Sequence, residues 1–302
     1  MTRNETKMGA GFRELPLVLF TALTIAGAGV GTAHLSLGFL GWVPLVPARG
    51  VMALLGILLA LGLLLSLGHL GRPFRSVLAL SRIGRSPLSN EVLVVGVTLA
   101  ASLVSVALPA GHFLVAPLTL TALVSSVLTL LALGLVYRLP GQLSWVGPVL
   151  VQPLVLGIAF GLTVLLGTLP AGTGARSELL ILLILLADGL LVWDRTRRIS
   201  GALYRGVPAH PRFLGKRGVA VILRILLGVL LPAGALLWGW AVLAGILLFL
   251  NLFLDRFLFY GLGVRCDTEA EVVRVEAALR AGADPSFESF DSTPTFIRAG
   301  ER

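Results

Sequence analysis

The feature that most constrains this chain is a succession of apolar runs, each long enough to cross a lipid bilayer. The first covers 26 residues, Leu15 to Leu40, without one charged side chain, and a helix needs about 20 such residues to span roughly 30 Å of hydrocarbon. Of 302 residues, 56% are hydrophobic and 13% charged, with a mean hydropathy of +0.95. Soluble domains are far more polar, and the short alternating segments of a β-barrel are not seen. The sequence predicts an all-α integral membrane protein.

The apolar runs predict eight transmembrane helices, which would suit two four-helix bundles. The first run is too long for a signal-peptide core and lacks a small-residue cleavage site, so we expect it to be retained. The chain then divides into an N-terminal segment (1–14), an anchor domain (15–261) and a C-terminal extramembrane tail (262–302). The expected spans are 15–40, 50–67, 92–108, one that follows a turn at 109–111 and ends near 137, 149–169, 179–193, and two within 219–260 that turn near 232–240.

The basic residues of the loops favour one side of the predicted membrane. If successive loops alternate, one side collects most of the arginines and lysines, and the other has only Arg49 and Arg176. Because loops rich in Lys and Arg stay in the cytoplasm, we expect both termini and the 70–90 loop there, in a cell inner membrane. A basic face also suits docking of an acidic partner subunit or contact with lipid phosphates.

Cysteine usage limits the cofactors that the chain can hold. Cys266 is the only cysteine, whereas an iron–sulfur cluster or a zinc site requires several ligands of this kind. Any such cofactor must therefore belong to a partner, and we predict no metal site and no covalent cofactor. The formal net charge of +9 is explained by membrane topology and anionic lipid without a nucleic-acid partner.

The connection between the second and third runs carries the residues best suited to chemistry. His69 ends one run and Glu91 opens the next behind Ser89, a plausible helix N-cap. Two antiparallel helices joined here would place both side chains at one membrane face, at the depth of a quinone head group. Quinol oxidation releases two protons; an imidazole titrates near neutral pH, and burial raises the pKa of a carboxyl group. The alternative is structural: His69 caps backbone carbonyls, while Glu91 pairs with Arg72 or Arg75.

The same connection resembles the signature of a known family. Residues 68–73 read Gly-His-Leu-Gly-Arg-Pro, and residues 86–91 read Ser-Pro-Leu-Ser-Asn-Glu. This pair of motifs is similar to that of the dimethyl sulfoxide reductase membrane-anchor subunits. The sequence departs from the family pattern at Pro87 and Asn90, where the family favours tryptophan and arginine. Two weaker similarities to this family are Tyr137 with Pro140 and Trp145, and the segment 255–260.

The resemblance implies an eight-helix anchor for anaerobic respiratory electron transfer. Such an anchor binds menaquinol and passes electrons to a four-cluster iron–sulfur subunit, and from there to a molybdopterin catalytic subunit that acts on the terminal substrate. It implies quinol binding and proton transfer for His69 and Glu91. Related anchors serve sulfite-oxidising complexes that reduce quinone, so the direction of electron flow stays open. Supporting residues on the same segment would be Arg72, Pro73, Arg75 and Ser89.

Two charged residues lie inside predicted spans. An isolated charge at the bilayer centre costs about 2.5–3.5 kcal/mol on the insertion scale, so Asp188 and Arg224 should be paired or face a polar cavity. A mutual ion pair, a proton route, or snorkelling of Arg224 to the interface would each meet this requirement. A secondary transporter or channel built around the pair is the alternative to an anchor, although we find no clear repeated halves or matching interrupted helices.

Two histidines raise the question of a haem. A b-type haem can take axial histidines from two helices of a bundle. His112 falls in the turn between the third and fourth predicted spans, and His34 lies toward that same end of the first span. This arrangement gives little support to haem ligation, and we do not expect a haem.

Overall fold

A computed structural model describes residues 15–69, 81–136, 151–166, 174–204 and 217–261. Throughout these ranges the regular structure is helical, as predicted. The five-residue π-helical turn η6 joins α9 to α10, so that the three form one rod. In chain order the elements are α2 (Leu15–Phe39), α3 (Arg49–His69), α4 (Pro87–Ala107), α5 (Val115–Val136), α6 (Gln152–Leu165), α7 (Gly174–Tyr204), α9 (Arg217–Ile225), η6 (Leu226–Leu230), α10 (Leu231–Leu237) and α11 (Ala241–Gly261).

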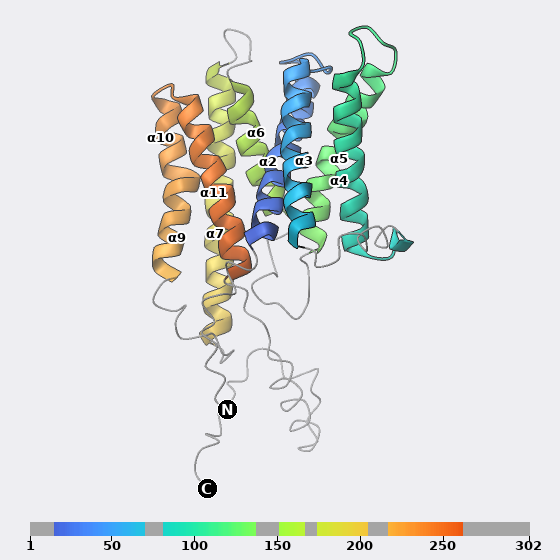
Figure 1. Cartoon of the computed structure of the whole chain (residues 1–302). Coiled ribbons are helices and arrows are strands. Elements are labelled where there is room, and N and C mark those ends of the chain that lie inside the picture. The colour runs from blue at the N-terminus through green and yellow to red at the C-terminus, as the bar shows by residue number, and fades with distance from the viewer. Residues whose placement is uncertain (1–14, 70–80, 137–150, 167–173, 205–216, 262–302) are drawn as a thin grey trace.

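The rods run up and down in sequence, as Figure 1 shows. By their packing the described rods form two groups of four. In the first group, α2 to α5, each helix packs on the next and α5 returns to α2. The second group consists of α6, α7, the α9–α10 rod and α11. The central helix is α2, which also contacts α6 and α11 and is buried at every residue from Phe20 to Leu35. One large apolar core therefore joins the two groups.

Five described helices are long and apolar enough to cross a membrane: α2, residues 49–67 of α3, α4, α5 and residues 241–260 of α11. The remaining predicted spans correspond to α6, α7 and the α9–α10 rod. Of these, α6 and residues 221–237 are apolar but shorter, whereas α7 carries Asp188 within its apolar stretch. The chain is a multi-pass membrane protein, and α7 and the α9–α10 rod carry three of the described buried charges, Asp188, Arg195 and Arg224.

Glycines allow α2 and α6 to cross at backbone contact. A β-carbon on Gly29 would overlap the backbone of Gly157, and one on Gly161 would overlap the backbone of Gly29. Small residues let helices approach closely in a membrane, where packing rather than the hydrophobic effect drives association. This crossing fixes the second helix group against the central helix of the first.

Two boundaries differ from the expected ones for physical reasons, and the turn expected within 232–240 lies at the far end of that range. Helix α4 begins at Pro87 rather than near residue 92, because proline at the first helical position costs no hydrogen bond. Helix α7 continues past its apolar part to Tyr204 and extends beyond its neighbours in Figure 1. Pro232 lies inside the rod rather than at the turn: it cannot donate to the Gly228 carbonyl, and the π-helical turn lies directly before it. The turn follows at Gly239, whose φ is 76°.

Candidate functional site

The start of α4 places the predicted carboxylate inside the helix. Ser86, with φ −121° and ψ 126°, is the residue before the helix, and Pro87 follows it. The prediction that Ser89 is the N-cap is therefore wrong, because Ser89 is buried in the first turn. The backbone N–H of Gly84 donates to Oδ1 of Asn90 at 2.7 Å, which closes the turn before α4. Glu91 consequently follows one full helical turn instead of opening the helix.

Glu91 is a deeply buried acidic group with one unpaired oxygen among the described residues. Only 2% of its surface is exposed, and its Oε1 atom has no hydrogen-bond partner among the described residues. Buried polar atoms are nearly always paired, so an unpaired one calls for a partner such as internal water or a ligand. A carboxyl group with a free oxygen can accept a proton from a bound ligand or donate one to it.

His69 lies at the same end of the first helix group as Glu91. It is the last residue of α3, which packs beside α4, and Figure 1 shows the end of α3 level with the start of α4. The backbone thus brings the two residues to one end, as expected, while the side chain of His69 lies outside the described part. Three predicted supporting residues also lie outside the described residues: Arg72, Pro73 and Arg75.

A second polar site fills the interior of the other helix group. We call it the Arg224 cluster. Arg224 reaches Asp188 through Nη1 at 2.9 Å and Nη2 at 3.0 Å, so the mutual ion pair considered for these two helices is formed. Its Nε donates to Asp255 at 3.1 Å and its Nη1 to Asn251 at 2.6 Å. The members are Gln152, Asp188, Arg195, Arg224, Asn251, Asp255 and Arg256.

Asp255 is the acceptor on which most of the Arg224 cluster converges. It accepts from Gln152 at 2.7 Å and from Arg256, and Arg195 lies 3.7 Å away. The guanidinium carbons of Arg195 and Arg256 also lie 5.1 and 4.9 Å from the ring centre of Phe259, within the range of a cation–π contact. The cluster joins α6, α7, α9 and α11.

Sequence reasoning identified only Asp188 and Arg224 as a polar pair. Asp255 and Arg256 were noted as part of a weak motif at the end of the last span, where charges usually meet the interface. Gln152 and Asn251 gave no such signal, because single amides are ordinary in apolar runs. The available clue was two adjacent charges, Asp255 and Arg256, within an otherwise apolar helix.

His34 and His112, at the end of the molecule opposite Glu91, both contact backbone groups. The Nε2 atom of buried His34 lies 2.9 Å from the carbonyl oxygen of Pro44, in the segment that follows α2. The Nδ1 atom of His112 accepts from the backbone N–H of Leu114 at 3.2 Å. Within the described ranges no group of three or more His, Cys, Asp or Glu side chains could hold a metal ion.

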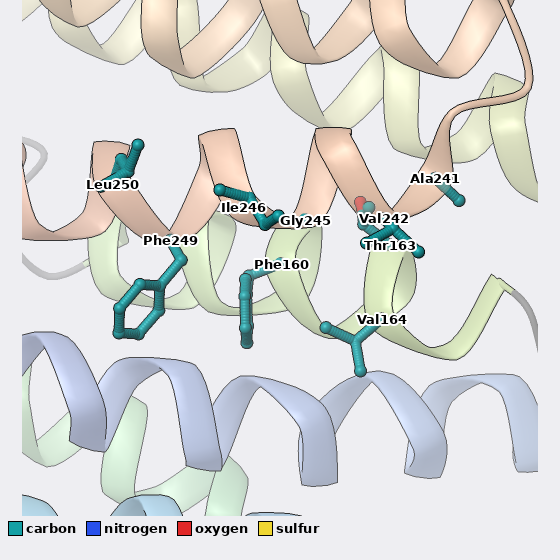
Figure 2. Close-up of a pocket in the computed structure, with 9 residues that line it drawn as sticks. All are labelled: Phe160, Thr163, Val164, Ala241, Val242, Gly245, Ile246, Phe249 and Leu250. Carbon is teal, nitrogen blue, oxygen red and sulfur yellow. The ribbon is translucent and has the colours of Figure 1, made fainter.

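A cavity of about 440 Å³ lies between α6 and α11, as Figure 2 shows. Its walls are apolar, and Phe160 and Phe249 pack within 6.0 Å of each other beside it. The hydroxyl of Thr163, its one polar side chain, donates to the carbonyl of Ala159 at 2.8 Å. It therefore offers no group for proton transfer.

Comparison with known proteins identifies the family. The family model described as DMSO reductase anchor subunit (DmsC) matches residues 8–179, which cover α2 to α6 and the motifs around His69 and Glu91. No curated protein matches the chain. Since the family model covers more than half of the sequence, the chain belongs to the DMSO reductase anchor subunit (DmsC) family.

Proposed function

We propose that this anchor subunit binds menaquinol at the end of the first helix group where α3 ends and α4 begins. The observation that carries the proposal is Glu91, whose Oε1 is buried and unpaired among the described residues. A quinol hydroxyl is a hydrogen-bond donor that would satisfy this oxygen. His69, at the end of the adjacent helix, supplies the second group.

The chemistry needs no catalytic cofactor in this chain. A quinol that is oxidised to a quinone loses two electrons and two protons. The Glu91 carboxylate accepts one proton and the His69 imidazole the other, since both groups can act as general bases near neutral pH. The electrons leave for an iron–sulfur subunit, expected to carry four clusters, and then for a molybdopterin catalytic subunit. The family description supports such a complex.

The proposed setting is a bacterial-type inner membrane crossed by all eight rods. Both termini and the loops rich in arginine would then lie on the cytoplasmic side. His69 and Glu91 lie where α3 ends and α4 begins, and Figure 1 shows these helix ends on one side of the molecule. The basic loops would meet either the partner subunits or anionic lipid.

Two other functions make different predictions. A quinone-reducing anchor, as in a sulfite-oxidising complex, would use the same residues with electrons moving the other way. A transporter would need a solute site, and the Arg224 cluster is the only polar candidate of the described second group. Its two carboxylates are both ion-paired, which favours a role in holding helices together.

Purification of the native complex tests the proposal. We expect the chain to copurify from detergent-solubilised membranes with a cysteine-rich iron–sulfur protein and a molybdopterin protein. Menadiol added to the oxidised complex should reduce the clusters, measured by their visible absorbance. A chain that purifies alone and moves a solute into liposomes would overturn the anchor function. Clusters that reduce menadione but never oxidise menadiol would indicate the reverse direction.

A further inference from the structure

The buried face of α4 is polar along its whole length. Seven of its residues are buried, and only Val95 and Ala101 among them are apolar. The exposed face is aliphatic, with Leu93, Val97 and Leu103 each more than a third exposed. In a membrane the exposed aliphatic face meets lipid, and the buried face of α4 combines small hydroxyl residues with one ionisable group, Glu91. The buried polar residues are Ser89, Glu91, Thr98, Ser102 and Ser105.

Helix α5 faces α4 with hydroxyl groups of its own. The Thr98 hydroxyl lies 2.8 Å from Ser125 Oγ, 3.2 Å from Thr129 Oγ1 and 2.8 Å from the carbonyl oxygen of Val94. A hydroxyl has one proton to donate, so Thr98 has more acceptors in reach than it can satisfy at once. Alternative hydrogen-bond patterns of this kind are what a hydroxyl group needs to relay a proton. The buried hydroxyl residues of α5 are Thr119, Ser125, Ser126 and Thr129.

Small polar residues also act as packing groups between membrane helices, so the hydroxyls alone do not define a path. The second observation is Glu91, on the same buried face, with Oε1 unpaired among the described residues. The buried hydroxyls of Thr24 and Thr32, on the neighbouring helix α2, also have no partner in the described part of the chain. Buried polar atoms left without protein partners are commonly satisfied by internal water.

We propose that the hydroxyl-lined interior of the first helix group is a proton path that leads from Glu91 toward the opposite end of α4. The inference rests on the proposed quinol site. The Glu91 carboxylate takes a proton from the quinol and passes it on, and each oxygen along the path accepts one proton and gives up another. From Ser89 to Ser105 the path covers about 24 Å at 1.5 Å per residue, most of the roughly 30 Å of hydrocarbon. Water bridges the roughly 10 Å between Glu91 and Thr98.

The test measures how many protons the whole complex releases at each membrane face for every two electrons that reach the clusters. The purified complex, its clusters oxidised beforehand, is reconstituted into vesicles of one determined orientation and mixed with menadiol. Cluster absorbance counts the electrons, and pH dyes inside and outside count the protons at each face. Thr98→Val removes the central hydroxyl with little change of shape. Thr121→Val is the matched control, because Thr121 is an exposed threonine of α5 that donates to the Pro117 carbonyl.

We expect the parental complex and Thr121→Val to release at least one proton per two electrons at the face opposite Glu91. In Thr98→Val this ratio should fall about tenfold, a modest effect for a lost proton-transfer group, while Thr98→Ser should restore it. Should Thr98→Val not fold, Ser125→Ala tests the same contact with a smaller change. A parental ratio in Thr98→Val, or in Ser125→Ala where that variant replaces it, would overturn the path, as would release of every proton at the Glu91 face. A different result tests the quinol site itself: if menadiol reduces no clusters in the parental complex, the proposed quinol site is wrong.

Discussion

Arg224 holds Asp188 with both terminal nitrogens of its guanidinium group, at 2.9 and 3.0 Å. Both side chains are almost fully buried, and the two residues, on different helices, are 36 positions apart in sequence. Two parallel N–H···O bonds fix geometry as well as charge. The pair therefore sets how the α9–α10 rod lies against α7 in the second helix group.

Removal of the Arg224 side chain should destabilise the second helix group. In Arg224→Ala, Asp188 loses the guanidinium group that pairs with it among the described residues, and Asp255 loses one of its three arginines. Breaking a buried ion pair on one side costs about 3–5 kcal/mol, because a charge is left uncompensated. We expect a loss of this size in denaturant unfolding of the purified chain in detergent. Arg197→Ala, at an exposed arginine of α7, is the control and should change the free energy of unfolding by less than about 0.5 kcal/mol. Equal losses in the two variants would contradict the stabilising role of the Arg224–Asp188 pair.

Gly228 leaves the space that the Arg224 side chain occupies. A β-carbon at this position would collide with Nη1 of Arg224 and lie 2.7 Å from Nδ2 of Asn251. Gly228→Ala should therefore displace the guanidinium group and destabilise the chain by about 1–3 kcal/mol, as overpacking does. Gly234→Ala is the control four residues beyond η6, since nothing lies within 4 Å of its β-carbon. Thermal unfolding of the two variants in the same detergent measures the difference in stability. Equal unfolding temperatures for the two variants would contradict the collision with Arg224.

One added methyl group should also destabilise the crossing of α2 and α6. In Gly161→Ala the new β-carbon would overlap the backbone of Gly29, and backbone cannot move aside as a side chain can. We expect a loss of about 2 kcal/mol or more. Gly96→Ala, with open space around its β-carbon, should be neutral or stabilising by up to about 1 kcal/mol, because alanine favours helix. If both variants have the stability of the parent, the close crossing is wrong.

Much of the fold could be predicted from hydropathy alone. Runs of apolar residues with few charges predicted the order and the approximate bounds of the eight rods, because a membrane helix must satisfy its own backbone. The start of α4 was missed because Ser89 and Ser86 are both possible caps, and Pro87 favours the earlier one. The length of α7 was missed because its last part is polar and hydropathy does not register it.

The candidate sites could be predicted only in part. His69 and Glu91 were found because the chain between them makes their helices neighbours. Asp255 is 67 residues from Asp188 in sequence, and only the tertiary packing of α7, α9 and α11 places both beside Arg224. The polar inner face of α4 was not predicted, because the spacing of Ser and Thr in a sequence does not by itself say which face is buried.

The oxidation of menadiol by the intact complex with Glu91→Gln tests the central claim most directly. The amide has nearly the shape of the carboxyl group but cannot take up a proton at neutral pH. We predict that cluster reduction by menadiol slows by about 100-fold, the lower range for a lost general base, while Glu178→Gln, on α7 at the other end of the molecule, reacts as the parent does. Cluster reduction at the parental rate in Glu91→Gln would contradict the assignment of Glu91 to quinol oxidation.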